Sequence, residues 1–164
     1  MAKWQGSNFL GVLRGSEMNS CDRLNSVATD LVDLGKAWTA TQRRVVACRI
    51  AEWACRSADV AAYLNGDRLR FLSDSSYQTT TAERQGIADE VSDLDEKYFE
   101  IVEQHDGLDD AGKAMSWFRK ARAVAAVSYA LDASSVETFC EALYEAHAAT
   151  DDLAGLRRLC SVAE

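Results

Sequence analysis

The residues of this chain that could do chemistry are its carboxylates, its two histidines and its five cysteines. The carboxylates gather between Glu83 and Asp110, where eleven acidic residues stand against two basic ones, Arg84 and Lys97. The net charge of that segment is 2 − 11 = −9, and the net charge of the whole chain is −8. Nearly all of the net negative charge therefore lies in one stretch.

Carboxylates on helices can hold two iron or manganese ions when Glu-x-x-His motifs on two helices turn their ligands inward. Here Val102 stands three residues before His105, and Tyr144 stands three before His147, so the motif is missing twice. His147 also lies on a stripe of apolar residues at helical spacing, which favours a core histidine over a ligand. We therefore expect no metal and no cofactor.

Nucleophilic catalysis needs a nucleophile, a base that activates it and a third group that orients the base. The sequence has two histidines and no strand-turn-helix elbow, so nothing indicates such a triad. It also lacks GxxxxGK[ST] and GxGxxG, so no phosphate-binding loop is indicated. A glycosidase-type pair of carboxylates stays open, although helical carboxylates usually form a solvated face. We expect the protein not to be an enzyme.

The cysteines are odd in number, and none of them forms a CxxC motif, which argues against a zinc knuckle and a redox dithiol. Four of the five fall on or beside apolar helical stripes, as is typical of small buried thiols in a reducing compartment. We expect all five to be reduced and unligated. They are Cys21, Cys48, Cys55, Cys140 and Cys160.

Length and composition indicate one globular domain. A chain of 164 residues can close a core without disulfides or metal, and its apolar content of 48% is ordinary. The longest apolar run is far shorter than the roughly 20 residues that span a bilayer. The first residues lack the apolar core of a signal peptide, so we expect a soluble, cytoplasmic protein. Proline is absent, which favours helices.

The acidic segment is predicted to form one amphipathic helix. Thr80 and Glu83 have the spacing of a capping box, and Gly107 marks the end. Apolar residues recur every three or four places, which puts them on one face. This stripe contains Ile87, Val91, Leu94, Tyr98, Ile101 and Val102. Steps of three, four and seven link a second set on other faces, here named the acidic row: Asp89, Asp93, Glu96, Glu100 and Glu103.

The remaining periodic segments predict an all-α, single-domain bundle of about six to eight helices, because no stretch alternates as a strand would. Residues 1–18 form an N-terminal arm, residues 19–164 form the domain, and the polar loop 73–81 is mobile. Helices are expected from 19 or 20 to Gly35, from Thr39 to a stop at Asn65-Gly66, over 67–72, from 109 or 110 to about 131, from Ser134, and from Thr150 onward.

Basic residues form two clusters that could make a basic patch, with Arg43 and Arg44 in one and Arg119, Lys120 and Arg122 in the other. The isoelectric point near 4.8 opposes phosphate binding, so direct nucleic-acid binding is not expected. The acidic row suggests the reverse, since it could attract a basic partner by electrostatic steering. The alternative is a solvated face that only keeps the protein soluble.

Two segments, Trp38–Cys55 and Ala123–Cys160, resemble the all-helical immunity proteins of bacterial polymorphic-toxin systems. The resemblance covers about 55 residues and rests on alanine spacing and helix order. It implies a compact, alanine-rich bacterial protein that neutralises a toxin by binding it. No functional residue can be carried over from the family.

These observations predict a binding protein that engages a partner with a basic surface, such as a toxin or a nuclease, through the acidic row. Its most concrete version is an immunity-type or inhibitor protein. A second hypothesis is a helical accessory subunit of a nucleoprotein complex, which would use the basic clusters. A third is a small helical enzyme that binds a metal or ligand. No membrane partner is expected.

Overall fold

The computed structural model describes residues 20–60, 62, 64, 66–74, 76–104 and 111–161. Eight helices contain 82% of these residues, and no strand occurs among them, which confirms the all-α class. The predicted arm 1–18, as well as His105 and Gly107, lie outside the described residues. The helices are α1 (Ser20–Asn25), α2 (Thr29–Ala37), α3 (Ala40–Ser57), α4 (Gly66–Ser73), α5 (Thr81–Gln104), α6 (Ala111–Ala130), α7 (Val136–Thr150) and α8 (Leu153–Ser161).

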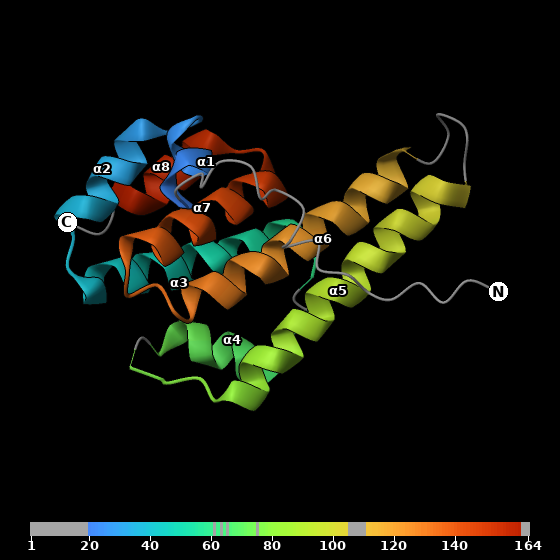
Figure 1. The fold of residues 1–164 in the computed structure, drawn as a ribbon, viewed down its shortest axis with the longest axis horizontal. Helices are drawn as coiled ribbons and strands as arrows, with labels where there is room; N and C mark the ends of the chain where they lie inside the picture. The colour runs from blue at the N-terminus through green and yellow to red at the C-terminus, as the bar shows by residue number, and fades with distance from the viewer. Residues whose placement is uncertain are drawn as a thin grey trace.

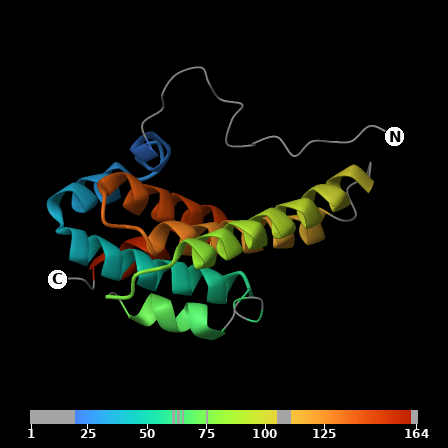
Figure 2. The ribbon, with the colours of Figure 1, turned by 60° about the horizontal axis from the view of Figure 1, so that its bottom comes forward.

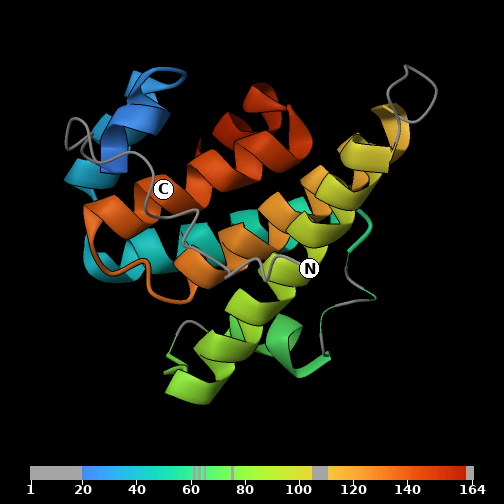
Figure 3. The ribbon, with the colours of Figure 1, turned by 45° about the vertical axis from the view of Figure 1, so that its right-hand side comes forward.

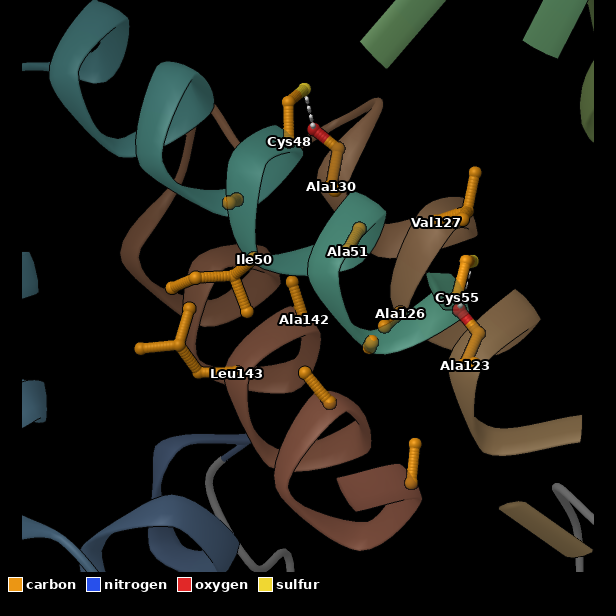
Figure 4. Close-up of a cluster of buried hydrophobic side chains, with 14 of the residues drawn as sticks. Cys48, Ile50, Ala51, Cys55, Ala123, Ala126, Val127, Ala130, Ala142 and Leu143 are labelled. Carbon is orange, nitrogen blue, oxygen red and sulfur yellow. Dashed lines mark hydrogen bonds between the residues drawn. The ribbon is translucent and has the colours of Figure 1, made fainter. Parts of the chain in front are cut away.

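Helices α3, α6 and α7 pack against one another and form the centre of the bundle (Figure 1). Their contact surfaces consist largely of alanine, valine and cysteine, and these small side chains let the helices approach closely. Figure 4 shows side chains from all three helices meeting in one cluster. Helix α6 is buried on more than one face, as predicted, because it lies between α5 on one side and α3 and α7 on the other.

Two buried cysteines belong to this core. The thiol of Cys48 donates to the carbonyl of Ala130 at 3.7 Å, and that of Cys55 donates to the carbonyl of Ala123 at 3.6 Å (Figure 4). Burial raises the pKa of Cys48 to about 11 and the pKa of Cys55 to about 12. Both thiols therefore stay protonated and act as small core residues.

The single helix predicted from residue 19 or 20 to Gly35 is wrong, because the chain forms α1 and α2 with a break at residues 26–28. The Ser26 hydroxyl donates to the carbonyl of Arg23 at 2.7 Å, a local bond that competes with continued helix. Val27, placed in the predicted stripe, is 39% exposed. Gly35 does not end a helix but lies buried inside α2.

Helix α3 begins at the predicted Thr39–Gln42 capping box and ends at Ser57, earlier than the predicted stop at Asn65-Gly66. Asp59 adopts the left-handed conformation at φ 53°, and the amide of Val60 donates to the carbonyl of Cys55 at 3.0 Å. This 6→1 bond closes a helix end of the Schellman type, with aspartate in place of glycine. Gly66 instead begins α4, which confirms the predicted short helix.

The capping box predicted at Thr80 is confirmed, and the one predicted at Ser134 is wrong by one residue. The Thr80 amide donates to Glu83 Oε2 at 2.7 Å, and the Glu83 amide donates to Thr80 Oγ1 at 3.2 Å, as predicted. The box predicted at Ser134 is displaced by one residue, since the side chain of Ser135 caps α7 by accepting from the Thr138 amide at 3.1 Å.

The loop between α4 and α5 is held to the bundle by Tyr77. Its ring stacks on Phe71 with centroids 3.9 Å apart, and its carbonyl accepts a hydrogen bond from Arg44. The predicted mobility of residues 73–81 stays a prediction.

Helices α5 and α6 form an antiparallel hairpin that reaches beyond the bundle. Figures 1, 2 and 3 all show the end of α5 and the start of α6 projecting away from α3, α7 and α8. Helix α6 also contacts α3 and α7, and so joins the hairpin to the bundle. One helix of the hairpin carries the whole acidic row. No helix in the described ranges is long and apolar enough to cross a membrane.

Candidate partner-binding surface on the α5–α6 hairpin

The inner face of α5 is set by the apolar stripe. Ile87 is 1% exposed and Leu94 is 2% exposed, while Val91 is partly buried against the core. Val102 is 48% exposed, so its assignment to the buried stripe is wrong. It belongs to the last turn of α5, the end of the helix that projects beyond the bundle (Figure 3).

The acidic row faces solvent. All five of its carboxylates belong to exposed residues, and none of them forms an ion pair with another described residue. Asp89 accepts a hydrogen bond from Gln85 Nε2 at 2.8 Å within the same helix. The predicted phase of α5 is therefore right for the row, and its charge is open to a partner.

Other carboxylates of α5 are used inside the protein. Asp95 forms a bidentate ion pair with Arg122 of α6, at 2.6 and 2.8 Å. Glu83 accepts from Thr80 and from the Tyr77 hydroxyl, the latter at 2.6 Å. Glu83 and Asp95 therefore differ from the acidic row, because their carboxylates bind other residues of the protein.

Exposed apolar side chains lie on the same hairpin as the acidic row. Of the four large apolar residues exposed in the described chain, three lie where the hairpin projects: Phe99 at 44%, Val102 at 48% and Met115 at 42%. Phe99 follows Glu96 by three residues and precedes Glu103 by four, so on a helix it neighbours both. The surface therefore combines charge with an exposed aromatic ring, a combination that sequence reasoning missed because it placed no weight on Phe99.

The first basic cluster holds backbone carbonyls at helix ends. Arg43 donates to the carbonyl of Gly35 in the last turn of α2 at 3.1 Å, and to that of Ser134 at 2.6 Å. Arg44 donates to the carbonyl of Leu131, just after α6, at 2.8 Å. These guanidinium groups satisfy carbonyls in the last turn of α2 and in the connection from α6 to α7.

The second basic cluster lies elsewhere on α6. Arg122 is paired with Asp95 and with Glu145, and Lys120 Nζ lies 4.8 Å from the ring centroid of Trp117. Arg119 is exposed. Twelve residues of helix separate it from Leu131, or roughly 18 Å. The two predicted basic clusters are therefore distinct, and four of their five members are engaged in internal contacts: Arg43, Arg44, Lys120 and Arg122.

An ion network built on two buried glutamates joins α1, α5, α6 and α7. Glu145 is 3% exposed and pairs with Arg23 at 2.9 Å and with Arg122 at 3.2 Å, and Arg23 also pairs with Glu141 at 2.8 Å. Burial raises the pKa of Glu141 despite the nearby Arg23. Because arginines occupy both carboxylates, the arrangement is suited to fixing α1 on α7. The sequence signal was two glutamates four residues apart on an otherwise apolar helix.

The described residues contain no group of three or more His, Cys, Asp or Glu side chains placed to hold a metal ion. His147 is partly buried on α7, which agrees with the predicted core position. The prediction of a satisfied histidine is not met, because its Nδ1 has no hydrogen-bond partner among the described residues.

The structure brings two cysteines together that the sequence keeps 119 residues apart. Cys21 of α1 and Cys140 of α7 have their sulfur atoms 2.7 Å apart, and both are free thiols. No spacing rule could have found this pair, because the packing of α1 on α7 creates it.

Comparison with family models, with curated proteins and with solved structures finds no match to this chain. The resemblance to immunity proteins stays a prediction.

Proposed function

We propose that this protein is a non-enzymatic binding protein that engages a partner with a basic surface through the acidic row of α5. The observation that carries the proposal is the position of the row, which is exposed and forms no ion pair within the described chain, on a hairpin that projects from the bundle (Figure 2). A projecting helix can reach into a concave partner surface that a flat face would not enter.

The chemistry of the surface supports this proposal. Neighbouring like charges on a helix repel by a few tenths of a kcal/mol per pair, and a basic partner relieves that repulsion. The field of the row also accelerates encounter with a cationic surface. Aromatic side chains are enriched among residues that dominate binding energy, and Phe99 stands beside the row.

The most concrete version is a cytoplasmic immunity-type or inhibitor protein, whose partner is a toxin or a nuclease. Proteins that act on nucleic acid carry basic surfaces that neutralise phosphates, and a row of carboxylates is complementary to such a surface. The resemblance of Trp38–Cys55 and Ala123–Cys160 to immunity proteins supports the same version.

The second hypothesis, an accessory subunit of a nucleoprotein complex, depends on the basic clusters. Arg43 and Arg44 hold backbone carbonyls, and Arg122 is neutralised by two carboxylates. These contacts remove cations that would contact phosphates, so the observations favour the acidic row.

The proposal is tested by capture from a lysate of the source organism, with three immobilised proteins compared by quantitative mass spectrometry. They are wild type, the row variant Glu96→Lys with Glu100→Lys, and the control Asp22→Lys with Asp33→Lys. The control makes the same charge change at exposed positions of α1 and α2.

We expect a basic protein to be retained by wild type and by the control, and to be lost from the row variant. Equal capture by all three proteins would contradict a role for the row. All three proteins should give the same circular dichroism spectrum, which separates lost binding from lost folding.

A further inference from the structure

The distance between Cys21 Sγ and Cys140 Sγ is unlike that of any other thiol contact described in this protein. At 2.7 Å it lies between a covalent S–S bond of about 2.05 Å and the 3.6–3.8 Å at which thiols here reach carbonyl oxygens. Helices α1 and α7 pack directly on each other, so the approach is a property of the fold. We propose that Cys21 and Cys140 are an oxidation site that forms an intramolecular disulfide with a hydroperoxide as oxidant.

The two thiols are suited to different steps. Cys21 is partly exposed, whereas Cys140 is fully buried, so a small oxidant reaches Cys21 first. The Cys21 thiolate attacks one peroxide oxygen, the O–O bond breaks, and the departing hydroxide takes up a proton as water. Cys21 is then a sulfenic acid.

The second step closes the bridge. The sulfur of Cys140 attacks the sulfenic sulfur, the S–O bond breaks, and hydroxide leaves with the Cys140 proton as a second water. Two thiols and one hydrogen peroxide thus give one disulfide and two waters, with two electrons passing to the peroxide. Burial raises the pKa of Cys140, so the neighbouring sulfenic acid, and not a free thiolate, makes it react.

The other three thiols should not compete. Cys48, Cys55 and Cys160 are each about 1% exposed or less, and burial raises their pKa values to about 11, 12 and 12. They lack both access for the oxidant and thiolate character. Oxidation should therefore select one pair among five cysteines.

The bridge would have a mechanical consequence. It would join α1 to α7 beside the ion pairs of Arg23 with Glu141 and Glu145, which already hold the two helices together. Because 119 residues separate the two cysteines, the cross-link would restrict the unfolded chain over most of the domain.

The experiment treats the reduced full-length protein with equimolar hydrogen peroxide and maps its peptides by mass spectrometry without reduction. Wild type and the control Cys48→Ala should lose two hydrogens and yield one peptide that joins Cys21 to Cys140. Cys21→Ala should yield none. The oxidised wild type should melt about 5–10 °C above its reduced form, and a reductant should reverse the shift.

A bridge between other cysteines, or conversion of Cys21 to sulfinic acid without a bridge, would overturn the proposal. So would five free thiols in wild type after treatment. These outcomes are read on wild type, so they hold even where a variant folds poorly.

Discussion

At the scale of single residues, α5 shows how closely buried and exposed positions alternate. Leu94 is 2% exposed and packs in the core, while the neighbouring acids Asp93 and Glu96 face solvent. Farther along the same helix, Val102 is exposed because the hairpin has left the bundle. Whether a side chain of α5 is buried depends on its position along the projecting helix as well as on the helical phase. Sequence periodicity predicts only the phase.

This difference predicts opposite outcomes for two truncations on one helix. Leu94→Ala should lower the free energy of unfolding by about 2–5 kcal/mol, because it removes a buried side chain and leaves a cavity. Val102→Ala should change it by less than about 0.5 kcal/mol. Urea unfolding followed by circular dichroism measures both. A loss below about 0.5 kcal/mol for Leu94→Ala would place the wrong face of α5 inward.

A second residue-scale prediction concerns pH. Asp30 of α2 accepts two hydrogen bonds from Arg157 of α8, at 2.8 and 2.9 Å, and this contact lowers the pKa of Asp30 below its ordinary 3.8. The ion pair therefore contributes stability above that value, and the contribution is lost as pH falls through the lower folded pKa. Both side chains are half exposed, so the effect should be small.

NMR titration of the Asp30 carboxyl group tests this contact. Arg157→Gln should raise the pKa of Asp30 toward 3.8, whereas Arg158→Gln, at a more exposed neighbouring position, should leave it unchanged. The difference in stability between wild type and Arg157→Gln should vanish below the folded pKa of Asp30. A difference that persists there would show that Arg157 acts by packing alone.

At the scale of helices, the sequence predicts the helix starts at Thr39 and Thr80 correctly and the end of α3 incorrectly. Thr39 and Thr80 each cap a helix as predicted, because a capping box depends on residues within one turn. The end of α3 was placed too late, because Asp59 adopts a conformation for which glycine is the usual signal. The break after α1 was missed because Ser26, whose hydroxyl donates to the carbonyl of Arg23, is a residue that a continuous helix also tolerates.

Some features of the candidate surface could likewise be predicted from the sequence, and others could not. Exposure of the acidic row followed from spacing alone, since a stripe facing inward fixes what faces outward. The exposure of Phe99 and Met115 did not, because apolar residues at helical spacing are expected to be buried, whereas these two lie on the hairpin and are 44% and 42% exposed. The pairing of Arg122 with Asp95 likewise depends on the register of α5 against α6.

Helix packing gives a prediction with a control in the same protein. A Cβ atom on Gly35 of α2 would lie 2.6 Å from Phe139 Cδ1 on α7, whereas one on Gly112 of α6 would meet no atom within 4 Å. Gly35→Ala should therefore cost about 1–3 kcal/mol through overpacking. Gly112→Ala should be neutral or stabilise by up to about 1 kcal/mol.

Thermal or urea unfolding of the two glycine variants measures the difference directly. Equal stability of both would mean that α2 and α7 can separate freely, and that close packing does not fix their contact.

At the scale of the whole molecule, the bundle contains the hydrophobic core and the hairpin carries the acidic row. Helices α3, α6 and α7 supply a dense core of small residues, and the ion network of Glu145 fixes α1 and α6 around it. The same α6 extends outward and packs along α5, so the acidic row is carried by a helix that α6 connects to the core (Figure 1). A row carried on a formed helix loses less conformational entropy on binding than one on an irregular loop.

The measurement that tests the acidic row most directly is the association rate with the captured basic partner, at low and at high salt, for wild type and for Glu96→Lys with Glu100→Lys. Salt at physiological strength screens charges beyond about 8 Å. Wild type should associate about tenfold faster or more at low salt, and the variant should be slow with little or no salt dependence. Equal rates in all four conditions would show that the row only solvates the helix and takes no part in binding.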